Sequence, residues 1–148
     1  MYQKRILSYQ MRIDERTELP CKGFLQEIDN TLKAKQEYVG GTIQNIRITP
    51  EIDMLCNDDG KLIGLPFNRV WFYEGQPVDF IMGNILFVRH DDKGNYTSIL
   101  EEDIPTILEQ FKVCVVLSRD LIIPVPEEEL REYKESRGTS GKNPRRKS

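Results

Sequence analysis

The chain has 148 residues, of which 39% are hydrophobic and 30% charged, and this composition is typical of a globular domain whose core needs no disulfide or metal. No apolar run approaches the roughly 20 residues of a membrane-spanning helix, and the first residues lack the apolar segment of an export signal. Three cysteines without a C-x-x-C spacing favour reduced thiols and a cytoplasmic location, with no membrane partner.

The net charge of -3 is unevenly distributed along the chain. Residues 1–130 hold 14 Lys and Arg against 22 Asp and Glu, whereas residues 131–148 hold 7 against 2. An acidic body repels a phosphate backbone, so we expect no direct binding of nucleic acid. We predict one folded domain over residues 1–130 and a basic, disordered tail over residues 131–148, which serves either as a solubilising end or as a weak electrostatic arm.

The first elements follow from local patterns. Residues 7–13 alternate apolar and polar side chains, which predicts a half-buried strand, and residues 22–28 predict a second strand that forms a hairpin with it. Good helix formers over residues 31–39 follow Asp29 and Asn30, both of which can cap a helix. We therefore expect a strand hairpin followed by a short helix.

The middle of the chain favours strands. β-Branched residues predict a strand over residues 42–49. Residues 52–56 and 61–63 flank Asn-Asp-Asp-Gly at positions 57–60, a sequence typical of a tight turn, so we expect a hairpin there.

A similar turn sequence at residues 91–95 separates strand patterns at residues 85–89 and 96–99. It predicts a second hairpin. Two such turns between strands indicate a mostly antiparallel sheet.

The last third of the chain predicts a helix that ends near residue 111 and begins at Ser98 or, because Pro105 suits the first turn, at Asp103. Residues 112–117 predict a strand that is apolar on both faces, as in a central strand covered by a helix. Pro124 indicates an edge strand over residues 121–125, and an acidic first turn after Pro126 predicts a last helix.

These patterns predict an α+β fold. We expect an antiparallel sheet of about five to seven strands, with two or three short helices packed on one face.

Residues 64–73 hold the densest group of candidate binding side chains. They contain Gly64, an Asn-Arg pair at Asn68 and Arg69, and four aromatic residues that include Trp71 and Tyr73. In a loop, this combination suits a nucleotide, since a guanidinium binds phosphate, an aromatic face stacks on a base and an amide binds a base edge. Alternatively, the aromatic side chains fill the core and Arg69 pairs with a carboxylate such as Asp53 or Asp79.

Four further residues extend this candidate site. Arg47 could meet a phosphate, and the backbone of Gly41 or Gly83 could donate amide hydrogens to one. Asn84 follows Gly83 at a position suited to a turn. Gly41 is equally explained by the end of the helix before it.

Signals for catalysis and metal binding are weak. His90 is the single histidine and stands beside Asp91 and Asp92, as a solvated turn residue would. The cysteines are scattered, and no phosphate-binding, nucleophile-elbow or zinc-protease motif occurs. We therefore expect no metal, no cofactor and no enzymatic activity.

Four ordered motifs carry a resemblance to a known family: Val-Gly-Gly-x-Ile from position 39, Asp-Asp-Gly-Lys-Leu from 58, Gly-Leu-Pro-x-Asn-Arg from 64 and Ile-x-Gly-x-Ile-Leu from 81. Over residues 22–117 the chain resembles small proteins of bacterial phages and mobile elements that form a domain family of unknown function. The resemblance implies a phage-type accessory protein, and such proteins often disarm host defence by holding a partner or a nucleotide signal.

Three hypotheses on function follow. The first is a non-enzymatic protein, able to form a homo-oligomer, that sequesters an anionic nucleotide-like ligand such as a defence signal. The second is an acidic protein that inhibits a host defence protein or a nucleic-acid enzyme. The third, an enzyme acting on a nucleotide, requires His90 or a carboxylate cluster in the same pocket as Arg69.

Overall fold

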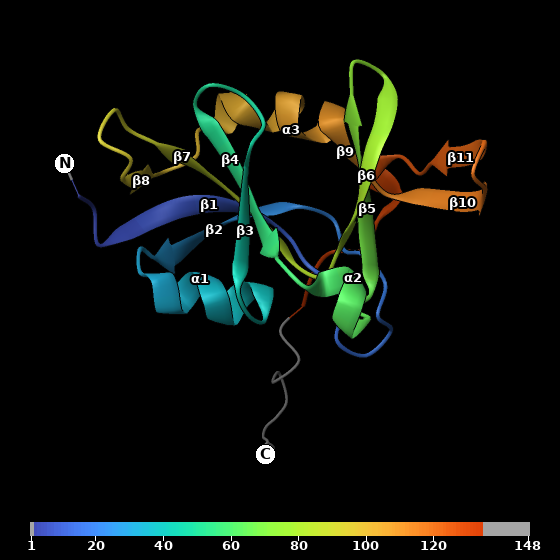
Figure 1. The fold of residues 1–148 in the computed structure, drawn as a ribbon, viewed down its shortest axis with the longest axis horizontal. Helices are drawn as coiled ribbons and strands as arrows, with labels where there is room; N and C mark the ends of the chain where they lie inside the picture. The colour runs from blue at the N-terminus through green and yellow to red at the C-terminus, as the bar shows by residue number, and fades with distance from the viewer. Residues whose placement is uncertain (1, 135–148) are drawn as a thin grey trace.

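The computed structural model describes residues 2–134 and shows one large sheet and two small ones (Figure 1). The main sheet has six strands, in the order β2 (Phe24–Asp29), β1 (Arg5–Met11), β7 (Ile85–His90), β4 (Ile52–Asn57) and β3 (Ile43–Arg47), with β8 (Tyr96–Thr97) paired to β7. Every pairing in this sheet is antiparallel, which confirms the predicted antiparallel character.

The other elements flank this sheet. A three-stranded sheet has the order β6 (Gln76–Met82), β5 (Phe67–Tyr73) and β9 (Phe111–Lys112), and a two-stranded sheet contains β10 (Cys114–Ser118) and β11 (Leu121–Pro124). The helices are α1 (Leu32–Val39), α2 (Gly60–Ile63) and α3 (Ile104–Gln110), together with the 3-10 turns η1 (Glu101–Asp103) and η2 (Glu127–Glu129). The described part of the chain is thus α+β.

Helices cover both faces of the main sheet. Leu86 and Val88 of β7 belong to a buried cluster with Tyr38 of α1, whereas Phe87 belongs to a second cluster with Ile107 of α3. Successive side chains of a strand point to opposite faces, so α1 and α3 lie on opposite sides of the sheet (Figure 1). The prediction that the helices share one face is therefore wrong. Successive side chains of β7 are apolar, so both faces of the sheet must be packed against other elements.

The start of α1 differs by a few residues from the prediction. Thr31, and not Asp29 or Asn30, caps the helix, since its side chain accepts a hydrogen bond from the backbone N of Ala34 at 3.0 Å. Asn30 is buried and accepts a hydrogen bond from Lys35 Nζ at 2.7 Å. The helix ends at Val39 and is capped by Gly40, whose φ of 84° suits glycine.

The two predicted turns have different outcomes. The hairpin across residues 91–95 is confirmed, because β7 and β8 pair on either side of it. The hairpin across residues 57–60 is wrong, since β4 pairs with β3 and β7 and residues 60–63 form α2. The Asn57 side chain accepts a hydrogen bond from the backbone N of Asp59 at 2.7 Å, which leads the chain into a helical turn in place of a strand.

Elements after residue 97 also deviate in part. Asp103 ends η1 and precedes α3, which confirms the later helix start. The strand predicted over residues 112–117 is not central: β10 pairs with β11 and with no other strand of residues 2–134. The last predicted helix is reduced to the single turn η2. Most of the predicted tail, residues 135–148, lies outside the described residues.

Candidate functional site

The segment of residues 64–73 is a strand and not a loop. Gly64 ends α2 with a φ of 75°, and β5 begins three residues later at Phe67. The aromatic residues that suggested a binding loop are also strong strand formers, and β5 pairs with β6 and β9. The sheet therefore sets which of these side chains reach solvent.

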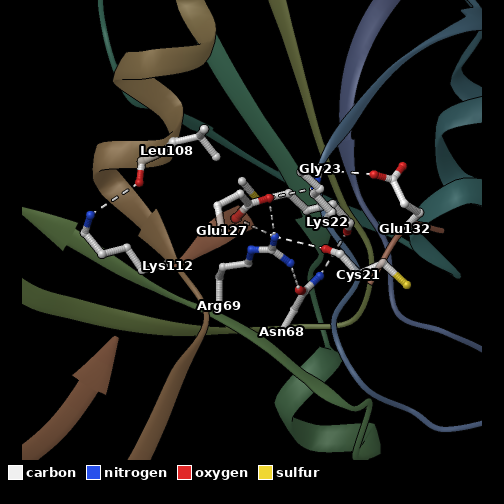
Figure 2. Close-up of polar contacts among 10 residues, drawn as sticks. Cys21, Lys22, Gly23, Asn68, Arg69, Leu108, Lys112, Glu127 and Glu132 are labelled. Atoms are coloured by element: carbon white, nitrogen blue, oxygen red, sulfur yellow. Dashed lines mark hydrogen bonds and ion pairs between the residues drawn. The ribbon is translucent and has the colours of Figure 1, made fainter. Parts of the chain in front are cut away.

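Asn68 and Arg69 are fully buried, each at 0% exposure. Asn68 Nδ2 donates hydrogen bonds to the carbonyl oxygens of Met11 at 3.0 Å and Gly83 at 2.7 Å. Its Oδ1 accepts a hydrogen bond from Arg69 Nη1 at 2.7 Å (Figure 2). The amide thus joins β5 to the end of β1 and to the residue after β6. Its hydrogen-bonding groups are used inside the protein, where no ligand meets them.

Arg69 links β5 to the C-terminal part of the described chain. Its Nη2 donates to the Cys21 carbonyl oxygen at 3.0 Å and lies 3.1 Å from both carboxylate oxygens of Glu127, one of which also accepts a hydrogen bond from the Gly23 backbone N at 2.7 Å (Figure 2). Arg69 Nε is buried without a hydrogen-bond partner among the described residues. Arg69 is therefore a structural anchor, paired with Glu127 and not with Asp53 or Asp79.

Burial and charge act in opposite directions on this ion pair. Burial lowers the pKa of Arg69, and the Glu127 carboxylate opposes this effect by favouring the charged guanidinium. Burial, together with the nearby Glu127 charge, also raises the pKa of Tyr9 to about 12. Arg69 and Glu127 each offset the charge of the other, because burying either charge alone would cost folding free energy.

Trp71 and Tyr73 lie further along β5 and have different surroundings. The Trp71 ring stacks on Phe111 with centroids 6.0 Å apart, and its Nε1 donates to Gln110 Oε1 at 3.1 Å. Tyr73 is 54% exposed at the turn between β5 and β6. Of the residues predicted in this segment, Tyr73 alone presents most of its side chain to solvent.

The two glycines and Asn84 of the predicted site have structural roles. A Cβ atom at Gly41 would come within 3.0 Å of the Asn57 amide, and Gly83 has a φ of 82°. Asn84 Oδ1 accepts from the backbone N of Ile13 at 2.8 Å, and its Nδ2 donates to the Tyr38 carbonyl oxygen at 3.1 Å.

Arg47 is exposed and lies 3.8 Å from Asp53 at the far edge of the main sheet. Asn68 contacts both Arg69 and Gly83, but the structure does not bring these residues together with Arg47, Gly41 and Tyr73 into one site.

His90 is paired and not freely solvated. Its Nδ1 lies 3.1 Å from Asp53 Oδ1, and Asn45 Nδ2 donates to the other oxygen of this buried carboxylate at 3.4 Å. Neither His90 nor Arg69 lines any of the three pockets described next. The condition for the enzyme hypothesis, His90 or a carboxylate cluster in the same pocket as Arg69, is not met in these three pockets, since Arg69 lines none of them.

Three pockets on the described residues have volumes of about 530, 650 and 290 Å³. Each is lined by more carboxylates than cations, and the charged residues are Lys112 with Glu74 and Glu109, Arg12 with Glu15, Glu27 and Glu37, and Lys61 with Asp58, Asp59 and Asp79. Such pockets repel an anion and favour neutral or cationic groups.

The surface feature that sequence reasoning missed is the two-stranded sheet of β10 and β11, which we call the apolar ribbon (Figure 1). It contains Val115, Leu117, Leu121 and Ile123, which are 49%, 62%, 49% and 45% exposed. The apolar run over residues 112–117 was visible in the sequence and suggested a covered strand. The structure leaves its second half, residues 115–117, exposed.

Residues 2–134 contain no group of three or more side chains that could hold a metal ion. None of the helices in this part of the chain has the length and apolar character needed to cross a membrane.

Comparison with known proteins gives one match. The model of a domain of unknown function, DUF3846, matches residues 16–112, and no curated protein and no solved structure matches. The match includes most of the span over which the resemblance was expected. The apolar ribbon, residues 114–124, lies beyond it.

Proposed function

The chain belongs to the DUF3846 family, whose function is unknown, and we propose that it is a non-enzymatic accessory protein that acts by binding another protein. The proposal rests on the surface of the protein itself. The observation that carries this proposal is the apolar ribbon, where four large aliphatic side chains are each about half exposed within nine residues. Contiguous exposed apolar patches mark protein interaction sites.

Burial of these side chains supplies the driving force. Burying a fully exposed Val, Leu or Ile side chain stabilises by about 1.5–3 kcal/mol, so each half-exposed side chain contributes roughly half as much. The pairing of β10 with β11 also leaves strand edges available to a partner. A protein surface that covers the ribbon therefore gains both apolar burial and backbone hydrogen bonds.

The acidic inhibitor hypothesis shares this mode of action but uses a different surface. Seven carboxylate residues already form ion pairs within the protein, namely Glu27, Asp29, Asp53, Asp79, Asp103, Glu127 and Glu132. These pairs leave the net charge unchanged, but they place a cation beside each of these carboxylates and so interrupt a continuous acidic surface. We therefore assign partner binding to the apolar ribbon, and the phage-type role in blocking a defence protein stays part of the proposal.

The sequestered nucleotide-like ligand stays a prediction. Thermal-shift measurements with cyclic dinucleotides and ADP-ribose derivatives test it, because a ligand that binds the folded state raises its melting temperature. The carboxylate-rich pockets lead us to expect no shift.

Site-specific photo-crosslinking tests protein binding. A photoreactive amino acid replaces Leu117 in the ribbon or, as a matched exposed control, Lys93 in the turn after β7. In bacterial cells that express the full chain, we expect protein adducts from position 117 and not from position 93, and we expect Leu121→Lys to suppress them. Absence of any protein adduct at position 117 would refute the proposed function.

A further inference from the structure

We propose that the protein forms a symmetric homodimer in which the apolar ribbons of two copies lie antiparallel and Arg119 of each copy enters the pocket at the base of the other ribbon. This inference rests on the proposed function, because it names a second copy of the chain as a partner of the same surface. The pocket, called here the base pocket, has a volume of about 530 Å³ and includes Tyr73, Glu74, Glu109 and Pro124.

The sequence of residues 135–148 offers no apolar side chain to cover the ribbon. Residues 135–148 contain no Val, Ile, Leu, Met or aromatic residue. A two-stranded sheet is at best marginally stable by itself, and more strands or a packed face are needed to support it. Another molecule can supply the apolar cover that residues 135–148 lack.

Charge favours the ribbon as the place where two copies meet. Residues 1–130 carry a net charge of -8, from 14 basic and 22 acidic residues, so most surfaces of two copies repel each other. Between Phe111 and Pro126 the charged residues are Lys112, Arg119 and Asp120, two cations and one carboxylate. Two acidic proteins approach with least repulsion through such a segment.

The two ends of the ribbon are chemically complementary. Arg119 is exposed in the turn between β10 and β11, while the base pocket presents the Glu74 and Glu109 carboxylates beside the Tyr73 ring. A guanidinium binds carboxylates through charge-assisted hydrogen bonds and stacks on aromatic faces. The base pocket is therefore suited to an arginine side chain.

Two-fold symmetry allows this contact to form twice. Lys112 and Pro124 place the base pocket at the end of the ribbon opposite the Arg119 turn. The five residues of β10 span roughly 13 Å at about 3.3 Å per residue. When two ribbons lie antiparallel about a two-fold axis, the turn of each reaches the base of the other, and the apolar side chains between them are covered.

Sedimentation velocity of the full chain over a range of concentrations tests the dimer. We expect a concentration-dependent dimer whose dissociation constant rises at least tenfold in Arg119→Glu and in Glu109→Arg. The double variant, which reverses both partners of the contact, should recover most of the wild-type affinity. Lys93→Glu makes the same charge change at an exposed turn and should leave the dissociation constant within about twofold of wild type.

A second variant tests the apolar contact. Leu117→Glu should give a monomer with the circular dichroism spectrum of the wild type, since Leu117 is 62% exposed. The homodimer is refuted if the wild-type protein is monomeric at its highest soluble concentration. The proposed interface is also refuted if Leu117→Glu leaves the dissociation constant of the dimer unchanged. If Arg119→Glu and Glu109→Arg weaken the dimer but the double variant does not recover, the pairing of Arg119 with the base pocket is wrong.

The photo-crosslinking experiment separates this inference from the proposed function. Adducts from position 117 to other proteins, together with a monomeric wild type, refute the homodimer and keep the proposed function. A monomeric wild type without adducts refutes both.

Discussion

Neutralising Glu127 should destabilise the protein strongly, although this residue lies in a short 3-10 turn near the end of the described chain. The Glu127 carboxylate faces Arg69 Nη2, with both oxygens at 3.1 Å, and also accepts a hydrogen bond from the Gly23 backbone N. Glu127→Gln keeps the size of the side chain but offers one acceptor oxygen to these two donors. It also leaves the Arg69 charge buried without a counter-charge.

The magnitude follows from the burial of the two partners. Removing one partner of a buried ion pair costs about 3–5 kcal/mol. The Arg69 side chain is 0% exposed, but that of Glu127 is 17% exposed, so water relieves part of the penalty. We expect a loss of about 3 kcal/mol in the free energy of unfolding, and at roughly 4 °C per kcal/mol for a chain of this size the melting temperature falls by about 12 °C.

Urea denaturation and thermal melts of the variants measure this loss. Glu128→Gln is the matched control, because Glu128 is exposed in the same turn, and it should change the free energy of unfolding by less than about 0.5 kcal/mol. The double variant Arg69→Met with Glu127→Met should lose less than the sum of the two single changes, since no charge is left unpaired. Equal stability of Glu127→Gln and Glu128→Gln would refute the anchoring role of the pair.

Two further changes test local features of the fold. Gly83→Ala should lower the free energy of unfolding more than Gly94→Ala does. Both positions have a positive φ, but a Cβ atom at Gly83 would come within 2.8 Å of Leu65, whereas Gly94 faces open space. Chemical denaturation of both variants measures the difference. The hydrogen bond from Arg89 lowers the pKa of Asp103 below its usual 3.8, so this contact stabilises the protein fully above about pH 4 and is lost as the pH falls through the lowered pKa. Asp103→Asn should reduce stability at pH 7 and weaken the dependence of unfolding on pH below about 4; an unchanged acid profile would contradict the role of the pair.

Local patterns in the sequence were sufficient for much of the secondary structure. The alternation over residues 7–13, the helix formers over residues 31–39 and the turn at residues 91–95 each correspond to an element of the structure, because neighbours in the chain decide these features. The start of α3 after Asp103 was likewise predictable from neighbouring residues. The candidate site was harder to predict, since a strand and a binding loop can contain the same aromatic residues.

The tertiary structure alone decided which side chains are buried and which surface is open. Asn68 meets a carbonyl group 57 positions away and Arg69 meets a carboxylate 58 positions away, so no local pattern could show that both are internal. The apolar run at residues 112–117 is equally consistent with a covered central strand and with an exposed ribbon. Strand pairing decides between them, because β10 finds one partner strand while β7, with a similar run, lies between β1 and β4 and is packed on both faces.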